Sequence, residues 1–182
     1  NNLSVKKTSF NFFADSSDTL IKNVESNLDG IIIKNGHLQI QKKEKIIVKS
    51  DFNSKIIINE KNIKNFLPFI KEMNLKKNKI NLDANLDHFL DISFDNTLKV
   101  IDYKYTNKGQ INALSLKLNK PLKNSLLEKD IHDLSFKDVD FNLNYGLKKK
   151  NSLTTKGKYS FDNINFQNFD LKNNFSNRAS AI

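Results

Sequence analysis

The stretch Ile80–Phe94, INLDANLDHFLDISF, limits most strongly what this chain can fold into. Its even-numbered positions carry Ile, Leu, Ala or Phe except at His88, and its odd-numbered positions carry Asn, Asp or Ser except at Phe89. Side chains alternate between the two faces of a strand, so the pattern predicts one long strand with an apolar face and a polar face. At about 3.3 Å per residue it would span roughly 50 Å, whereas ordinary strands have about 5–6 residues.

The same alternation returns along the rest of the chain. Ile46–Ile58 repeats it most clearly, with Ile47, Lys49, Asp51, Asn53 and Lys55 on the opposite face. Leu20–Leu28 fits either a short helix or a ragged strand, and we favour the strand because its neighbours on both sides have β character. Further strands are expected at Ser4–Phe13, Ile101–Tyr105, Ile111–Leu118, Val139–Tyr145, Leu153–Phe161 and Ile164–Phe175.

Two features inside these segments predict local irregularity. Asn35-Gly36 lies in the middle of Ile31–Ile40 and is typical of a type I′ turn, so this segment is expected to be a hairpin. Lys108-Gly109 predicts a turn or bulge. In Ile111–Leu118 the apolar residues move from odd to even positions, which predicts a β-bulge.

Helical spacing is found in two connections. In Asn59–Met73, apolar residues recur every three or four positions, and Pro68 should end or kink a helix near Leu67. We expect a short broken helix that covers the end or mouth of a sheet. Pro121–Asp133 is a second connection, in which Leu122, Leu126, Leu127 and Ile131 fit a helical turn.

These segments predict a mostly β fold of about eight to ten long antiparallel strands in a meander. The sheet is expected to curl into a groove or half-open barrel, with one or two short helices. We expect one β-rich unit over residues 1–175 and a frayed tail over 176–182. Because the chain begins at Asn1 and its only Met is Met73, we expect an excerpt of a longer repetitive protein.

The net charge of +10 raises the question of a nucleic-acid or anionic partner. Arg178 is the single Arg among 30 Lys and Arg residues. Arg, with its bidentate fork, is the residue favoured for reading bases and clamping phosphates. The Lys residues are scattered over strand faces and turns, so we expect solvated surfaces and no nucleic-acid partner.

No motif for catalysis, cofactor binding or metal binding occurs in the sequence. The chain has no Cys, which excludes disulfides and thiolate metal sites. His37, His88 and His132 lie in separate segments, and His88 is expected on an apolar face as a hydrogen-bonded or edge-located core residue. Asp83, Asp87 and Asp91 share one strand face, but successive members lie roughly 13 Å apart, too far to share one cation. We therefore expect no enzyme, no cofactor and no metal, and a row of Asp that pairs with Lys on neighbouring strands.

A sheet that is apolar on one side must bury that side. A trough filled by acyl chains satisfies this requirement without catalysis. We therefore expect a lipid-conducting groove, with headgroups towards a Lys-bearing rim. Its expected lipid-facing residues are Ile46, Val48, Phe52, Ile56, Ile80, Leu82, Leu86, Leu90, Ile92, Phe94, Phe141 and Leu143.

The segments Asn27-Leu-Asp-Gly-Ile31, Asn35-Gly36-His-Leu-Gln-Ile40 and GKYSFDNINFQNFDLKNNFSN (Gly157–Asn177) resemble those of AsmA-like proteins, the AsmA, TamB and YhdP group of Gram-negative envelope proteins. The resemblance implies an inner-membrane anchor outside this sequence, a long periplasmic β-groove, and phospholipid transport towards the outer membrane. It implies no catalytic residues. The five Gly residues and the many Lys and Asn differ from typical members, and an AT-rich genome would explain this composition.

Two other classes of function fit the sequence. One is a structural or adhesive β-rich surface module whose apolar faces pack into a closed core. The other is a basic nucleic-acid-binding module, which would need Lys on one face with aromatic residues between them. Partial exposure of Ile80, Leu82, Leu86, Leu90 and Ile92 would favour the lipid groove over the closed core.

Overall fold

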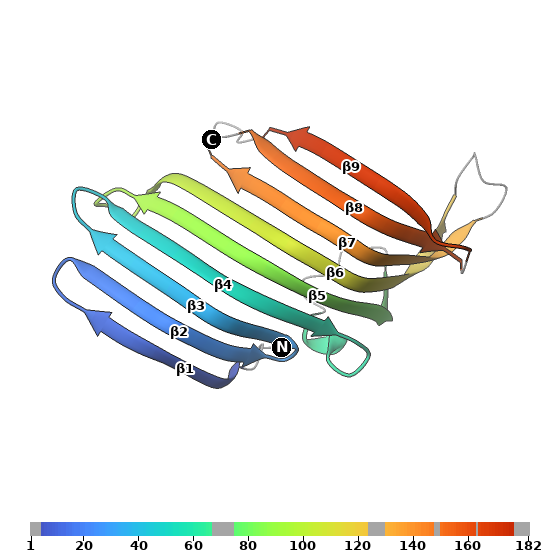
Figure 1. Cartoon of the computed structure of the whole chain (residues 1–182), viewed down its shortest axis with the longest axis horizontal. Helices are drawn as coiled ribbons and strands as arrows, with labels where there is room; N and C mark the ends of the chain where they lie inside the picture. The colour runs from blue at the N-terminus through green and yellow to red at the C-terminus, as the bar shows by residue number, and fades with distance from the viewer. Residues whose placement is uncertain (1–4, 67–74, 124–129, 148–149, 163, 177–182) are drawn as a thin grey trace.

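The computed structural model describes residues 5–66, 75–123, 130–147, 150–162 and 164–176. These residues form one sheet with the order β1-β2-β3-β4-β5-β6-β7-β8-β9, in which every neighbouring pair is antiparallel. Figure 1 shows the strands side by side in chain order, with the sheet open at β1 and β9. The predicted class, a meander of long antiparallel strands in a curled open sheet, is confirmed.

The strands are long, as the alternation predicts. Three of them are longer than the predicted strand Ile80–Phe94, with 20 residues in β5, 23 in β6 and 16 in β7. The bounds are β1 Val5–Ala14, β2 Asp18–Leu28, β3 Ile31–Lys42, β4 Ile46–Ile58, β5 Leu75–Phe94, β6 Val100–Leu122, β7 Ile131–Gly146, β8 Asn151–Phe161 and β9 Gln167–Phe175.

The predicted hairpin at Asn35-Gly36 is wrong. Both residues lie inside β3, where Asn35 has a φ of 51° and the register to β4 shifts between Lys34 and His37, as in a β-bulge. The hairpin turn falls at Asp29-Gly30, where φ is 52° and 116° and where β2 ends and β3 begins. Asp29-Gly30 has positive φ at both residues and Asn35-Gly36 only at Asn35. Both dipeptides favour such angles, so the sequence does not show which one reverses the chain.

The predicted bulge in Ile111–Leu118 is confirmed, whereas a turn at Lys108-Gly109 is not found. Asp83 pairs with Ala113 and Ala84 with Ile111, so Asn112 has no opposite residue on β5. Gly109 continues β6 with a φ of 152°, and a Cβ there would lie 2.1 Å from the carbonyl oxygen of Asn85. Only glycine permits this close approach of the two strands.

Bulges recur across the sheet and account for its curl. Lys7 in β1, Asn23 in β2 and Asn35 in β3 all have φ near 50°, and register shifts accompany them. Asp138 marks a similar shift between β7 and β8. Each bulge bends its strand and increases the local twist. β4 and β5 pair without a shift from Ile46 to Ile58, so they form a regular centre between bulged flanks.

The helix predicted in Asn59–Met73 is reduced to a short 3₁₀ turn in its described part. This turn, η1 (Ile63–Asn65), lies in the β4–β5 connection, and Ile63 and Phe66 are buried. The Asn62 amide donates hydrogen bonds to the carbonyl oxygens of Asp29 and Ile57, which ties η1 to one end of the sheet. The remainder of the prediction, including Pro68, lies outside the described residues.

The second predicted helical turn is wrong for its two outer members. Leu122 belongs to β6 and Ile131 to β7. Leu126 and Leu127 lie outside the described residues, as does the tail predicted to fray, apart from Ser176.

Candidate functional site: the apolar face of the curled sheet

The register places all twelve predicted groove residues on one face, which we call the inner face. Ile46, Val48, Phe52 and Ile56 of β4 stand opposite even-numbered residues of β5, which carry the same face across the pair. His88 pairs with Asn107, which pairs with Leu143, and this row brings β7 onto the inner face. The sequence pattern and the pairing therefore agree over four consecutive strands.

The inner face is neither sealed nor fully open. Ile80 is 6% exposed, while the other eleven predicted groove residues are partly exposed. The accessible surface of the chain is 12788 Å². A compact monomer of 182 residues exposes about 9,000 Å². The excess is expected of a single curled layer, and the described residues form no second layer over its apolar face.

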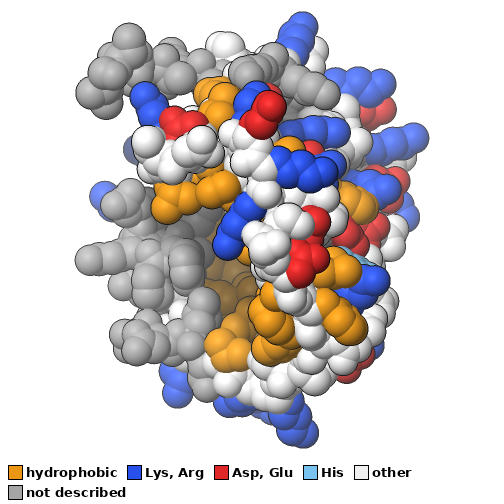
Figure 2. All heavy atoms as spheres, turned by 90° about the vertical axis from the view of Figure 1, so that its left-hand side faces the viewer, with side chains coloured by type: hydrophobic (Ala, Val, Ile, Leu, Met, Phe, Trp, Pro, Cys, Tyr) orange, Lys and Arg blue, Asp and Glu red, His pale blue; other side chains and the backbone are white. Residues whose placement is uncertain are grey.

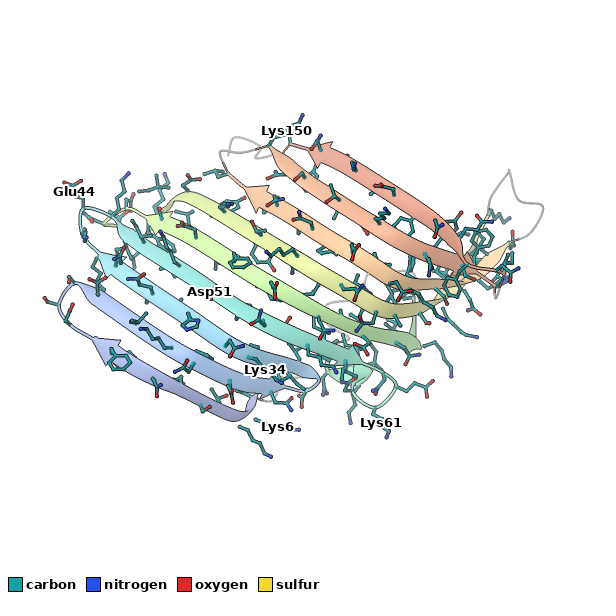
Figure 3. The ribbon with its side chains drawn as sticks, viewed as in Figure 1. Lys6, Lys34, Glu44, Asp51, Lys61 and Lys150 are labelled. Atoms are coloured by element: carbon teal, nitrogen blue, oxygen red, sulfur yellow. The ribbon has the colours of Figure 1, made fainter. Side chains whose placement is uncertain are left out.

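The curl gathers the apolar side chains in a hollow. Figure 2 looks onto the end of the sheet that carries the β3–β4 and β5–β6 turns, and it shows hydrophobic side chains inside the curve with charged side chains on the outer side. The β3–β4 turn is basic, since Lys42, Lys43 and Lys45 surround Glu44 there, and Glu44 is labelled in Figure 3. Charge thus lies at the rim and on the outer face.

A hydrogen-bonded cluster of four polar side chains interrupts the inner face near its middle. Ser54, His88, Tyr105 and Asn107 come from β4, β5 and β6, and we call them the mid-groove cluster. The His88 ring stacks on Phe52 with centroids 4.4 Å apart. Ser54 and Asn107 are buried, whereas His88 and Tyr105 are partly exposed. A second polar pair on this face, Thr8 and Ser26, is joined by a 2.8 Å hydrogen bond.

The hydrogen bonds of the mid-groove cluster fix the tautomer of His88. Two donor groups approach Nδ1, the Tyr105 hydroxyl at 2.8 Å and the Asn107 amide at 3.1 Å, so Nδ1 is the acceptor. The ring proton therefore resides on Nε2 and is donated to the Ser54 hydroxyl, 2.7 Å away. Burial lowers the pKa of His88 below its usual value, against a smaller opposing effect of the Asp87 carboxylate. His88 is thus neutral at pH 7.

The outer face is polar and laced with weak cross-strand contacts. The Asp row lies here, but among the described residues only Asp91 pairs with a Lys, Lys49 at 3.9 Å. Asp83 and Asp87 instead accept hydrogen bonds from Asn112 and Asn53. The expected Asp–Lys pairing therefore holds for one of the three carboxylates. Exposed contacts of this kind each contribute about 0–1 kcal/mol.

Two other predicted positions also lie on the outer face. His37 Nδ1 is 3.3 Å from a carboxylate oxygen of Asp51, and Figure 3 shows Asp51 on the face turned to the viewer. Phe89, the single apolar residue on the polar side of the β5 pattern, lies below the Lys108 ammonium at 5.4 Å from the ring centroid. A cation–π contact of this kind explains an exposed aromatic residue without a binding site.

The outer face also carries shallow depressions. One of about 300 Å³ lies over β7, β8 and β9 between Asp140, Lys156, Asp170 and Lys172, and one of about 270 Å³ lies over β4, β5 and β6 beside Phe89. Their linings mix both signs of charge. Over the residues that the structure describes, no three His, Asp or Glu side chains are placed to hold a metal ion, and no helix is long and apolar enough to cross a bilayer.

The sequence did not reveal the mid-groove cluster, because its members meet only through the pairing of three strands. Tyr105 ends the predicted strand Ile101–Tyr105, and Asn107 continues its alternation in β6 beyond the predicted end. The apolar pattern gave no reason to join either residue to Ser54. The sequence also missed the inner-face residues Leu134 and Phe136, which precede the bulge at Asp138 in β7. Comparisons of the chain with models of protein families, with curated proteins and with solved structures found no significant match.

Proposed function

We propose that the inner face is a lipid-binding groove that holds acyl chains and conducts them along the sheet without catalysis. The observation that carries the proposal is the partial exposure of an apolar face within the hollow of a single-layered sheet. Exposed apolar patches on soluble monomers rarely exceed a few hundred Å², and larger ones mark surfaces that bind lipid or protein. Acyl chains in the hollow would remove this surface from water.

The closed-core alternative is disfavoured by the same residues. Leu82, Leu86, Leu90 and Ile92 are partly exposed, and only Ile80 of the five discriminating positions is buried. Burial of Ile80 beside Ala84, at the end near η1, fits a groove that narrows at that end. A structural module with a closed core would hide the whole set.

The proposal extends to the setting that the resemblance implies. As a member of the AsmA-like group, the chain would act in the periplasm of a Gram-negative cell, anchored to the inner membrane by a segment outside this sequence. Phospholipids would be its cargo, and headgroup phosphates would meet Lys at the rim. The basic β3–β4 turn, with Lys42, Lys43 and Lys45, supports this orientation.

The first experiment combines lipid extraction with site-specific crosslinking. Mass spectrometry of the purified chain is expected to find copurifying phospholipid. A photocrosslinking amino acid at Leu86, on the inner face, is expected to label lipid, while the same group at Asp87, on the outer face, is expected not to. Labelling at both positions, or at neither, would contradict a one-sided groove.

A matched pair of variants tests whether the groove must be apolar. Leu90→Lys puts a charge on the inner face, and Phe89→Lys makes the same kind of change one residue away on the outer face, where Phe89 is 43% exposed. Copurifying lipid is expected to fall at least severalfold in the first variant and to stay at the wild-type amount in the second. Equal loss in both variants would point to a general defect in folding.

A further inference from the structure

The mid-groove cluster places hydrogen-bonding groups on the inner face, where the methylene groups of an acyl chain can neither donate nor accept a hydrogen bond. Along β5 it lies between Leu90 and Leu86, which are both apolar and on the same face. Asn107 is 8% exposed, and its Oδ1 is buried without a donor among the residues that the structure describes. A buried polar atom without a partner costs about 1–3 kcal/mol, so its presence in an apolar face calls for a reason.

The donors of the cluster are all used within it. The Tyr105 hydroxyl donates to His88 Nδ1, His88 Nε2–H donates to the Ser54 hydroxyl, and Ser54 reaches the carbonyl oxygen of Leu86 at 3.5 Å. The Asn107 amide donates to the Tyr105 oxygen at 3.0 Å. What remains is acceptor capacity, namely Asn107 Oδ1 and one lone pair on the Tyr105 oxygen.

We propose that the mid-groove cluster is a subsite for a hydroxyl group of an amphipathic lipid, which donates its one hydrogen bond inside the groove either to the Tyr105 oxygen or to Asn107 Oδ1. Tyr105 is partly exposed on the inner face and offers the first contact. Asn107 Oδ1 is buried, so a hydroxyl reaches it only when the Asn107 side chain turns and its amide leaves the Tyr105 oxygen. The inference rests on the proposed lipid groove and narrows its ligand class to lipids that carry a hydroxyl within the chain or beside it.

The chemistry disfavours an anionic group at this position. A carboxylate or phosphate needs donors or a positive charge, and the described donors of the cluster are already engaged. Neutral His88 stacked on Phe52 supplies no charge. Anionic headgroups therefore belong at the Lys-bearing rim, and a neutral hydroxyl belongs in the middle.

Competition between two chain-matched probes tests the subsite. A pyrene-labelled alkane serves as the reporter bound to the purified chain, and hexadecanol or hexadecyl methyl ether displaces it. The two competitors differ in the donated proton, so hexadecanol is expected to act at about tenfold lower concentration. Equal potency of the two would overturn the subsite, whereas failure of the reporter and both competitors to bind would overturn the groove itself.

Two sets of variants test whether the mid-groove cluster causes the preference for hexadecanol over the methyl ether. His88→Leu/Tyr105→Phe/Asn107→Leu makes the row apolar and is expected to bring the two competitors to equal potency while the reporter still binds. Thr8→Val/Ser26→Ala removes the other polar pair of the inner face and is expected to keep the tenfold preference. The reverse pattern would place the hydroxyl elsewhere and overturn the proposal.

A spectroscopic measurement on the wild-type chain does not depend on the folding of any variant. In ¹⁵N-labelled protein, hexadecanol is expected to shift the side-chain amide signals of Asn107, and the methyl ether is expected to leave them nearly in place. Equal shifts with both ligands would contradict a hydrogen bond to this amide.

Discussion

At the scale of single residues, His88 shows how an apolar environment selects one protonation state. Its ring lies against Phe52 and takes part in hydrogen bonds that require a neutral Nε2–H tautomer. Protonation would place a second N–H against two donors and a charge in a partly dehydrated site. The structure of the inner face therefore depends on His88 remaining neutral.

His88 is expected to make the folded chain less stable in acid. Burial lowers its folded pKa below the value of about 6.5 in an unfolded chain. The unfolded state therefore binds the proton first as pH falls. The contribution of His88 to the free energy of unfolding is complete above pH 6.5 and decreases as the pH falls below that value towards the folded pKa. Urea unfolding at pH 7.5 and pH 5.0 should show a larger loss in wild type than in His88→Leu.

The exposed histidines provide the control for this experiment. His37→Gln and His132→Gln should keep the full acid-induced loss, because neither residue lies in the mid-groove cluster. If His88→Leu loses as much free energy of unfolding between the two pH values as wild type does, His88 is not the group responsible.

At the scale of elements, the bulges explain both a success and a failure of prediction. The change of parity in Ile111–Leu118 was visible because apolar residues stand on both sides of Asn112. The bulge at Asn35 was not, because Asn-Gly has the same positive-φ preference in a turn and in a bulge. Periodicity thus predicted the strands well, while the points at which they bend required the register.

The bulge in β3 is expected to depend on the left-handed conformation of Asn35. Val at this position would be forced to a φ near 50°, which costs a β-branched residue about 1–2 kcal/mol. Asn35→Val should lower the free energy of unfolding by that amount, and Asn35→Gly should leave it unchanged or raise it slightly. Chemical denaturation of both variants measures the difference.

Lys34→Val is the matched control for the Asn35 variants. It makes the same kind of substitution one residue earlier, on an exposed side chain of the same strand whose φ is not positive. Its effect should stay within about 0.5 kcal/mol. A loss equal to that of Asn35→Val would show that the bulge conformation is not the cause.

At the scale of the whole molecule, the sequence predicted a sheet with one apolar face, but not the fraction of that face that is exposed to solvent. Exposure depends on the curl and on what the connections cover, which no local pattern encodes. Ile80 was predicted to face the groove and is buried, while the other predicted groove residues of β5 are partly exposed. The twelve predicted positions do share one face, because a period of two fixes faces over any length of regular strand.

The single-layered architecture should be measurable in denaturation. The chain keeps 12788 Å² accessible when folded, so unfolding exposes about a fifth less surface than it would in a compact domain of equal length. Since the denaturant m-value scales with newly exposed surface, it should be lower by about the same fraction. The measurement uses delipidated protein under two-state conditions. An m-value equal to that of compact domains of this size would indicate a closed core in solution.

The strand order β1 to β9 has a consequence for cooperativity. In the part of the chain that the structure describes, each strand forms its backbone hydrogen-bond ladders only with its neighbours in sequence, so the sheet is a nearly one-dimensional array of coupled units. The stability of the sheet is then approximately a sum of local terms. A destabilising substitution in one hairpin weakens the adjacent strands and leaves the strands at the other edge of the sheet unaffected. Such an array tolerates the gain or loss of whole hairpins in evolution, since the backbone pairing of the described strands does not depend on their number.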